Sequence, residues 1–411
     1  MHIQRAPRAK VDMQISVQDY LEHLGLAASL AISVFVLLGL ALRLHDTPDR
    51  RMHLWAMVAF FVVNALDMLD SLAFSVAFSG PSMLYQWQDV LIPGFMISVY
   101  FFVRGLTSSN PALRAKDWIH VVPFILALLC LLPSLALPGD VRSALDHSDV
   151  SDEYQRLVML GGTAFWVLWI VVLIVYGTLC VRRLVQHKRN IRDVFSDIEG
   201  KTLRWLDGLI CTIFILAAVA VADEVQILLG YPEIRTGAVV MLYDVILAGA
   251  FGLFALRATP PLPSWSEQVF PTETAAPEET PDPVPATGSR YARSGLGKAD
   301  LDRYAERLER RMATGQLWRD HALNLRGLAA EIAIPPIHLS EVLNTNLSMS
   351  FYDYVNQCRV QDACALLAST DQTILEISET VGFNAKSTFN TSFKKVTDQT
   401  PSQWRKTHHR R

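Results

Sequence analysis

Charged residues are scarce in this chain of 411 residues. Only 19% of the residues are Asp, Glu, Lys or Arg, whereas 51% are hydrophobic, and the mean hydropathy is +0.24. A soluble protein of this length carries more charge, so the composition excludes an ordinary soluble globular protein. Much of the chain is therefore expected to lie in lipid.

Cysteines and catalytic motifs are also scarce. The five cysteines are scattered and form no CxxC motif or Cys/His cluster, which excludes a disulfide framework and a zinc site. The apolar part of the chain contains no HExxH, GxSxG or phosphate-loop motif. We therefore expect neither an enzyme nor a bound metal or cofactor.

Seven apolar segments are each long enough to cross a bilayer, which takes about 20 helical residues. The first, fourth and fifth contain no charged residue. We place them at residues 24–42, 54–76, 84–103, 118–137, 157–181, 209–229 and 236–256. The expected fold class is all-α, with a polytopic transmembrane helix bundle of about seven spans and a soluble C-terminal domain.

The composition also suggests where the domains begin and end. We divide the chain into an N-terminal tail (1–23), a transmembrane sensor or anchor region (24–257), a linker (258–296) and a C-terminal domain (297–411). Residues 259–288 contain eight prolines. Such a segment buries too little apolar surface to fold, and its prolines favour an extended spacer of up to roughly 90 Å.

Lysine and arginine gather in alternate loops between the apolar segments. If the N-terminus lies outside, the third inner connection holds seven of them: Arg182, Arg183, Lys188, Arg189, Arg192, Lys201 and Arg204. The outer loops hold only Arg142, Arg156 and Arg235. The basic residues before the first segment favour the opposite orientation, but the larger count places the C-terminus inside.

Six acidic residues interrupt the apolar segments, where charge is costly. They are Asp67, Asp70, Asp89, Asp223, Glu224 and Asp244. Asn64, Asp67 and Asp70 recur at every third position and so share one side of a helix. These residues predict a site that senses a cation, an amine-bearing ligand or pH. The alternative is that they cap helices or join them by hydrogen bonds.

The C-terminal part contains a first helix-turn-helix pattern. Residues 325–332 would form the positioning helix and residues 335–344 the recognition helix, with Ala333 and Ile334 as the turn. Proline suits the start of the recognition helix because the first helical turn needs no backbone donor there.

A second helix-turn-helix pattern follows a connecting helix expected at about residues 351–368. Residues 374–380 would form its positioning helix and residues 385–395 its recognition helix, and Gly382 permits the turn between them. The whole region is basic, since residues 290–411 contain 17 Lys and Arg against 13 Asp and Glu.

Residues 298–407 resemble the signature of the AraC/XylS family of bacterial transcription regulators. The matching residues are Trp318, Leu325, Leu328, Ala329, Leu339, Ser340, Phe351, Tyr354, Val355, Asn356, Arg359, Ala363, Leu366, Leu367, Ile374, Ile377, Gly382, Phe383, Ser387, Phe389, Phe393, Lys394, Lys395, Thr400, Pro401, Ser402 and Arg405. The resemblance implies two recognition helices that enter successive major grooves on one face of DNA.

Helix position gives the candidate DNA contacts. Those of the first recognition helix are Ile337, Ser340, Glu341 and Asn344, and those of the second are Lys386, Ser387, Asn390 and Thr391. Lys394, Lys395, Arg359 and Arg405 are candidates for phosphate contacts or packing. The first helix carries Glu341 and no Lys or Arg, so the second is expected to dominate binding.

These observations predict a membrane-bound, one-component transcription regulator in the inner membrane of a bacterial cell, with its DNA-binding domain in the cytoplasm. The expected partners are double-stranded DNA, the lipid bilayer, RNA polymerase, a second copy of the chain and an unknown small ligand or ion. Two alternatives stay open. The apolar region could be a transporter with an appended regulatory domain, or an anchor that releases this domain by cleavage in the linker.

Overall fold

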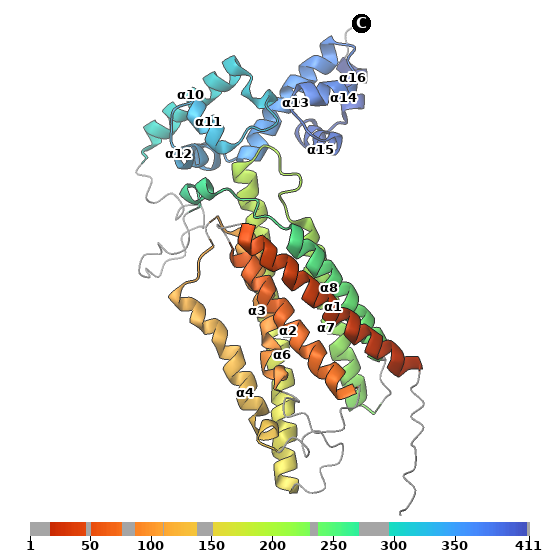
Figure 1. Ribbon diagram of the computed structural model, residues 1–411. Coiled ribbons are helices and arrows are strands. Elements are labelled where there is room, and N and C mark those ends of the chain that lie inside the picture. The colour runs from red at the N-terminus through yellow and green to blue at the C-terminus, as the bar shows by residue number, and fades with distance from the viewer. Residues whose placement is uncertain are drawn as a thin grey trace, which may run out of the picture. The chain divides into compact units, whose positions relative to one another are not determined.

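The computed structural model describes residues 17–46, 51–75, 87–109, 111–137, 151–230, 237–270 and 296–408. Every named secondary-structure element in these ranges is helical, which confirms the expected all-α fold class (Figure 1). The chain divides into two compact units. The first comprises residues up to 106, 111–181 and 208–259, and the second comprises 107–110, 182–207 and 260 onward.

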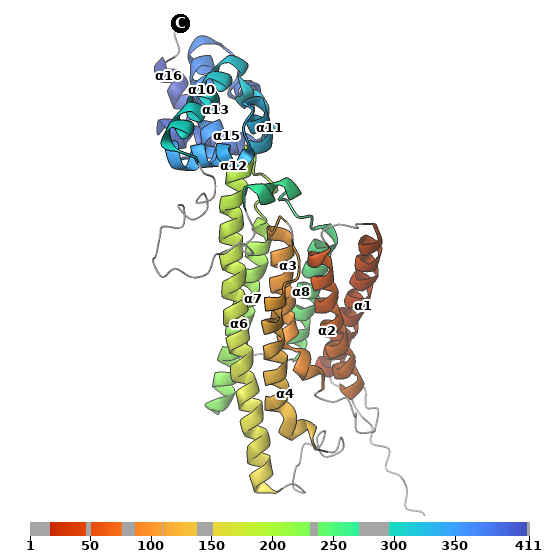
Figure 2. The ribbon, with the colours of Figure 1, turned by 90° about the vertical axis from the view of Figure 1, so that its left-hand side faces the viewer.

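Seven helical segments of the described chain are long and apolar enough to cross a membrane, as the sequence predicted. Figures 1 and 2 show the helices of the first unit running alongside one another. They are α1 (Val17–Asp46), α2 (Met52–Ser75), η1 (Gln88–Leu91) with α3 (Pro93–Thr107), η2 (Ala115–Val121) with α4 (Val122–Leu135), α6 (Asp152–Val194), α7 (Arg204–Leu228) and α8 (Gly237–Arg257).

The observed ends of these helices differ from the predicted ends by one to seven residues, except at the C-terminal end of α6. This helix continues past residue 181 to Val194 as one uninterrupted element. Its last part is rich in Arg and Lys, which have good helix propensity. Residues 182–194 belong to the second unit.

Close backbone approach and polar contacts hold α1 against α2 and α8. A Cβ atom built on Gly25 would lie 2.5 Å from the Cβ atom of Met241, so no larger residue fits there. The amide of Asn64 on α2 donates hydrogen bonds to the hydroxyls of Ser33, at 2.9 Å, and Ser29, at 3.3 Å. Buried polar groups are thus paired across the helices.

The first unit carries large apolar side chains on its surface. Phe35 is 70% exposed, Trp118 78% and Leu160 67%, and many other Leu, Ile and Val side chains of these helices are exposed as well. Soluble monomers rarely expose apolar surface on this scale. A lipid environment would make this surface favourable.

Residues 296–408, all of which the structure describes, contain nine helical elements. They are α10 (Lys298–Gly315), η5 (Leu317–Arg319), α11 (Leu325–Glu331), α12 (Pro336–Glu341), the π-helical turn η6 (Val342–Asn346), α13 (Phe351–Ser369), α14 (Ile374–Thr380), α15 (Lys386–Thr397) and α16 (Pro401–His408). They build two hydrophobic cores, one on each side of α13. The first core includes Leu308, Leu328 and Phe351, and the second includes Val360 and Phe389.

The beginning of the predicted linker is folded. Within residues 260–270, η3 (Ser264–Gln268) forms, and Val269 is fully buried in the first core. Trp265 and Phe270 pack against the same core. These three side chains supply apolar surface that can be buried in the core. The sequence of the rest of the proline-rich segment has few such side chains. Residues 271–295 lie outside the described residues.

Candidate DNA interface

The second helix-turn-helix consists of α14, a turn at Gly382, and α15. A capping box begins α14, because the Thr373 hydroxyl accepts from the Glu376 amide while the Glu376 carboxylate accepts from the Thr373 amide. Gly382 has a φ of +95°, and a Cβ atom there would lie 2.7 Å from the carbonyl oxygens of Trp318 and Arg319. The turn therefore needs glycine for both its backbone angle and its packing.

The helix α15 has one buried face and one exposed face. Phe389 and Phe393 are fully buried, with their ring centroids 5.5 Å apart, so they anchor the helix in the second core. The predicted DNA contacts on the opposite face are all exposed: Lys386, Ser387, Asn390, Thr391 and Lys394. An exposed polar helix face of this kind can enter a major groove.

The first recognition helix departs from the sequence-based prediction. Ser340 and Glu341 were expected to face outward, but they are 1% and 6% exposed. The prediction assumed one α-helix over residues 335–344, whereas α12 ends at Glu341 and continues as the π-helical turn η6. Ser340 and Glu341 precede this turn and lie in α12 itself, so the turn does not explain their burial. The neighbouring elements that pack around α12 bury them.

Other residues of this region remain near the surface. Ile337 and Asn344 are half-buried, and the Asn344 amide donates a 2.9 Å hydrogen bond to the Ser340 carbonyl. Thr345 and Asn346, which sequence reasoning did not select, are exposed in η6. Recognition of the π turn would have been needed to find them.

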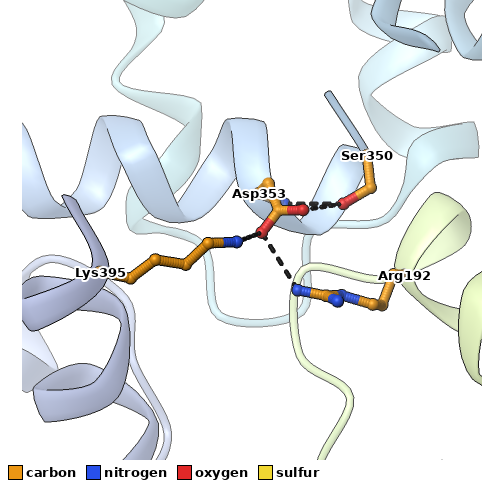
Figure 3. Close-up of polar contacts among 4 residues, drawn as sticks. All are labelled: Arg192, Ser350, Asp353 and Lys395. Atoms are coloured by element: carbon orange, nitrogen blue, oxygen red, sulfur yellow. Dashed lines mark hydrogen bonds and ion pairs between the residues drawn. The ribbon is translucent and has the colours of Figure 1, made fainter. Parts of the chain in front are cut away.

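Lys395, an expected phosphate contact, is held by an acidic side chain. Its ammonium lies 2.7 Å from Oδ1 of Asp353 near the start of α13, and Arg192 Nη2 lies 3.2 Å from the same oxygen (Figure 3). The Ser350 hydroxyl donates to Oδ2 of Asp353 at 2.7 Å. Burial alone would raise the pKa of Asp353, but the bonds from Lys395 and Ser350 and the charge of Arg192 hold this pKa below its usual range.

Arg359 is a packing residue of the DNA-binding domain. Its side chain is 1% exposed, and it donates to the carbonyl oxygens of Trp318 at 2.7 Å and Asp320 at 2.9 Å. It also donates to the carbonyl and the hydroxyl of Ser196, at 3.3 and 3.2 Å. Burial lowers the pKa of Arg359 to about 10, so the guanidinium stays charged at neutral pH.

Arg405, the remaining candidate for a phosphate contact or for packing, also forms a hydrogen bond within the domain. Its guanidinium donates a 2.5 Å hydrogen bond to the Gln372 carbonyl, which precedes α14. This bond joins α16 to the second helix-turn-helix. The geometry therefore favours packing over phosphate contact for Arg359 and Arg405.

The acidic residues of the apolar helices do not all lie together. Asp67 and Asp244 line one cavity of about 280 Å³, together with Asn64 and aromatic side chains that include Phe60 and Phe251. The rings of Phe60 and Phe251 stack with centroids 5.0 Å apart. This cavity combines carboxylates with aromatic faces, the two groups that attract organic cations.

Three of the other candidate sensing residues, Asp70, Asp89 and Asp223, lie outside that lining. Asp70 accepts a 2.8 Å hydrogen bond from the Gln88 amide, and Asp89 in η1 is close enough to Asp67 and Asp70 to interact with them electrostatically. Asp223 on α7 is 3% exposed and does not line the cavity. The side chain of Glu224 lies outside the described residues.

Comparisons with known proteins agree with the C-terminal geometry. The family described as "Helix-turn-helix domain" matches residues 328–407. An uncharacterized HTH-type transcriptional regulator of Staphylococcus aureus (strain COL) is 34% identical over 83 residues, which are 20% of this chain and 11% of that protein. The melibiose operon regulatory protein of Escherichia coli (strain K12) is 29% identical over 87 residues, which are 21% of this chain and 29% of that protein.

One solved structure also resembles this region. It is the C-terminal domain of AraT, a response regulator from Geobacillus stearothermophilus, with 28% identity and a TM-score of 0.23, covering 27% of this chain and 87% of that one. The chain spans less than a third of either curated relative.

The fold and the family match define a helix-turn-helix domain at the C-terminal end of the described residues. This domain is of the AraC type, as the resemblance in the sequence predicted.

Proposed function

We propose that this chain is a membrane-bound, one-component transcription regulator, which couples a stimulus at the membrane to promoter control. One observation carries the proposal: a single chain joins seven helices with apolar, exposed surfaces to an AraC-type DNA-binding domain. The excess of Lys and Arg in the inner connections supports a cytoplasmic location for that domain in a bacterial inner membrane. We also propose that this regulator has no enzymatic activity.

In this proposal α15 supplies most of the base readout. Asn390 can form two hydrogen bonds with an adenine edge, and Lys386 can donate to guanine. Lys394 would contact phosphates and so position the domain without reading sequence. In α12 and η6 the proposed DNA contacts are Ile337, Asn344, Thr345 and Asn346. Ser340 and Glu341 are buried and are not among them. RNA polymerase and a second copy of the chain are proposed as further partners, by analogy with the family.

The proposed sensing site is the cavity lined by Asp67 and Asp244. Two carboxylates beside stacked aromatic rings favour a small organic cation over an anion or a neutral ligand. Replacement of Asp67 and Asp244 together by Asn should abolish the response of a reporter promoter to the stimulus while leaving basal DNA binding unchanged. A response equal to that of the unchanged chain would refute this sensing site.

The membrane part of the proposal has a direct test. The intact chain with a C-terminal tag should stay in the membrane pellet after an alkaline wash, and the tag should be digested by protease in inverted vesicles but not in intact spheroplasts. Recovery of the intact chain in the soluble fraction, or protection of the tag in inverted vesicles, would contradict the proposal. A soluble tagged fragment that appears only on stimulation would instead support the releasable anchor.

A further inference from the structure

A segment of the second unit that lies outside the helix-turn-helix motifs packs against the DNA-binding domain. We define the docking segment as residues 192–197, the end of α6 and the residues that follow it. The Ser196 amide and hydroxyl both donate to the Leu323 carbonyl, at 3.3 and 2.6 Å, and Phe195 forms an antiparallel bridge with Asn324. The segment is therefore attached to the chain immediately before α11, in the first helix-turn-helix.

The docking segment also contacts the second helix-turn-helix and the helix between the two. Arg359 of α13 donates to the Ser196 carbonyl and hydroxyl, and Ser196 is 2% exposed. The Asn384 amide donates a 2.6 Å hydrogen bond to the Asp197 carboxylate. Arg192 pairs with Asp353, the residue that also holds Lys395 (Figure 3). One short segment thus bridges both halves of the DNA-binding domain.

The contact at Asn384 lies where a helix-turn-helix reads DNA. Ala385 is the N-cap of α15, so Asn384 directly precedes the recognition helix. The N-terminal residues of a recognition helix contact base edges in the major groove. The docking segment places the Asp197 carboxylate at this end, where it would repel the DNA phosphates.

We propose that the docking segment is an intramolecular inhibitor of DNA binding. While it is docked, it holds the Asp197 carboxylate against Asn384, at the N-terminal end of α15, and binds the domain through Leu323, Arg359 and Asp353. DNA binding requires its release, which leaves the domain attached to the apolar helices through residues 258–296. The inference rests on the proposed function, because it takes α6 and α7, the helices on either side of the segment, as membrane spans through which a stimulus would act.

Two substitutions of opposite charge test the inference in the full chain in lipid nanodiscs. Asp197→Ala removes a negative charge, whereas Arg192→Glu replaces a positive charge by a negative one, and both remove docking contacts. Binding to a fluorescein-labelled 40-base-pair duplex of random sequence is measured by anisotropy at fixed salt. Both variants should bind about five-fold or more tightly than the unchanged chain, the lower end of typical couplings between sites. General electrostatics cannot produce this result, because it would make Arg192→Glu bind more weakly.

Matched controls are available on the same segment of chain. Glu199 and Arg189 are exposed, and no hydrogen bond or ion pair of their side chains joins them to the DNA-binding domain among the described residues. Glu199→Ala and Arg189→Glu repeat the two charge changes and should leave the affinity within about two-fold. Affinities of the docking variants that equal those of their controls, or are weaker, would overturn the inference.

Hydrogen exchange of the unchanged chain gives a readout that needs no substitution. Inhibition requires that DNA and the docking segment weaken each other's binding equally. Saturating duplex should therefore speed exchange of the Ser196 amide, and unchanged exchange would overturn the inference. If no form binds the duplex, the proposed function itself fails. If all forms bind it equally, only the inhibition fails.

Discussion

Among single residues, Arg359 donates hydrogen bonds to three backbone carbonyl groups of the second unit. Arg359→Ala would leave the carbonyls of Trp318, Asp320 and Ser196 without this donor. We expect the free energy of unfolding of the domain to fall by about 3 kcal/mol. Native-state hydrogen exchange of the α13 amides in the full chain measures this loss. The control Arg326→Ala removes an exposed arginine and should change stability by less than about 0.5 kcal/mol.

Two neighbouring residues of α15 should affect DNA binding in different ways. Lys394→Ala removes one expected phosphate contact, so the slope of log K against log salt should become shallower by about 0.9. Asn390→Ala removes an uncharged group and should leave that slope unchanged, while costing about 1–3 kcal/mol on a specific site. Titrations of one duplex at several salt concentrations separate the two roles. Equal slopes for both variants would contradict the assignment.

Asp353 should make stability depend on pH in the acid range. Its folded-state pKa lies below the usual value, so its ionised form stabilises the folded domain above about pH 4. This stabilisation is lost as the pH falls through the folded-state pKa. Asp353→Asn should therefore be less stable than the unchanged chain at pH 7, and the difference should shrink below about pH 4. Urea unfolding at pH 7 and pH 3.5 measures it, and a constant difference would contradict the assignment.

At the scale of elements, the turn between α14 and α15 fixes the second recognition helix. Gly382→Ala would place a Cβ atom against two backbone carbonyls at a positive φ, so we expect a loss of about 2 kcal/mol or more in unfolding free energy. Gly327 inside α11 is the control, because the nearest atom to its added Cβ atom is 3.8 Å away. Gly327→Ala should stabilise the domain by up to about 1 kcal/mol. Equal thermal stability of the two variants would contradict this account of the turn.

Helices with strong local signals could be predicted from the sequence. The bounds of α14 match the prediction, and Gly382 turns the chain as expected, since capping residues and glycine act over a few neighbouring positions. The apolar runs predicted seven spans because length and composition alone define them.

Features that depend on distant residues could not be predicted. The burial of Ser340 and Glu341 follows from the packing of neighbouring elements around α12. The fold of residues 260–270 depends on the core that receives Val269. The contacts of Asp197 with Asn384 and of Ser196 with Leu323 join residues more than 100 positions apart. No local pattern encodes such pairs.

At the scale of the whole molecule, one chain joins a part whose surface suits lipid to a part whose surface suits water. The first unit has an apolar surface suited to lipid, and the second carries an AraC-type domain with a polar, exposed face on α15. Neither part alone would link a membrane stimulus to a promoter. The central claim is therefore that the intact, membrane-bound chain recognises specific DNA sites.

Genome-wide mapping of DNA crosslinked to the intact, membrane-bound protein in cells tests this claim most directly. The account predicts a limited set of discrete sites that share a sequence motif and that disappear in the Lys386→Ala, Asn390→Ala double variant, although this variant remains in the membrane fraction. Uniform background along the genome, or sites recovered only with a soluble fragment of the chain, would contradict it.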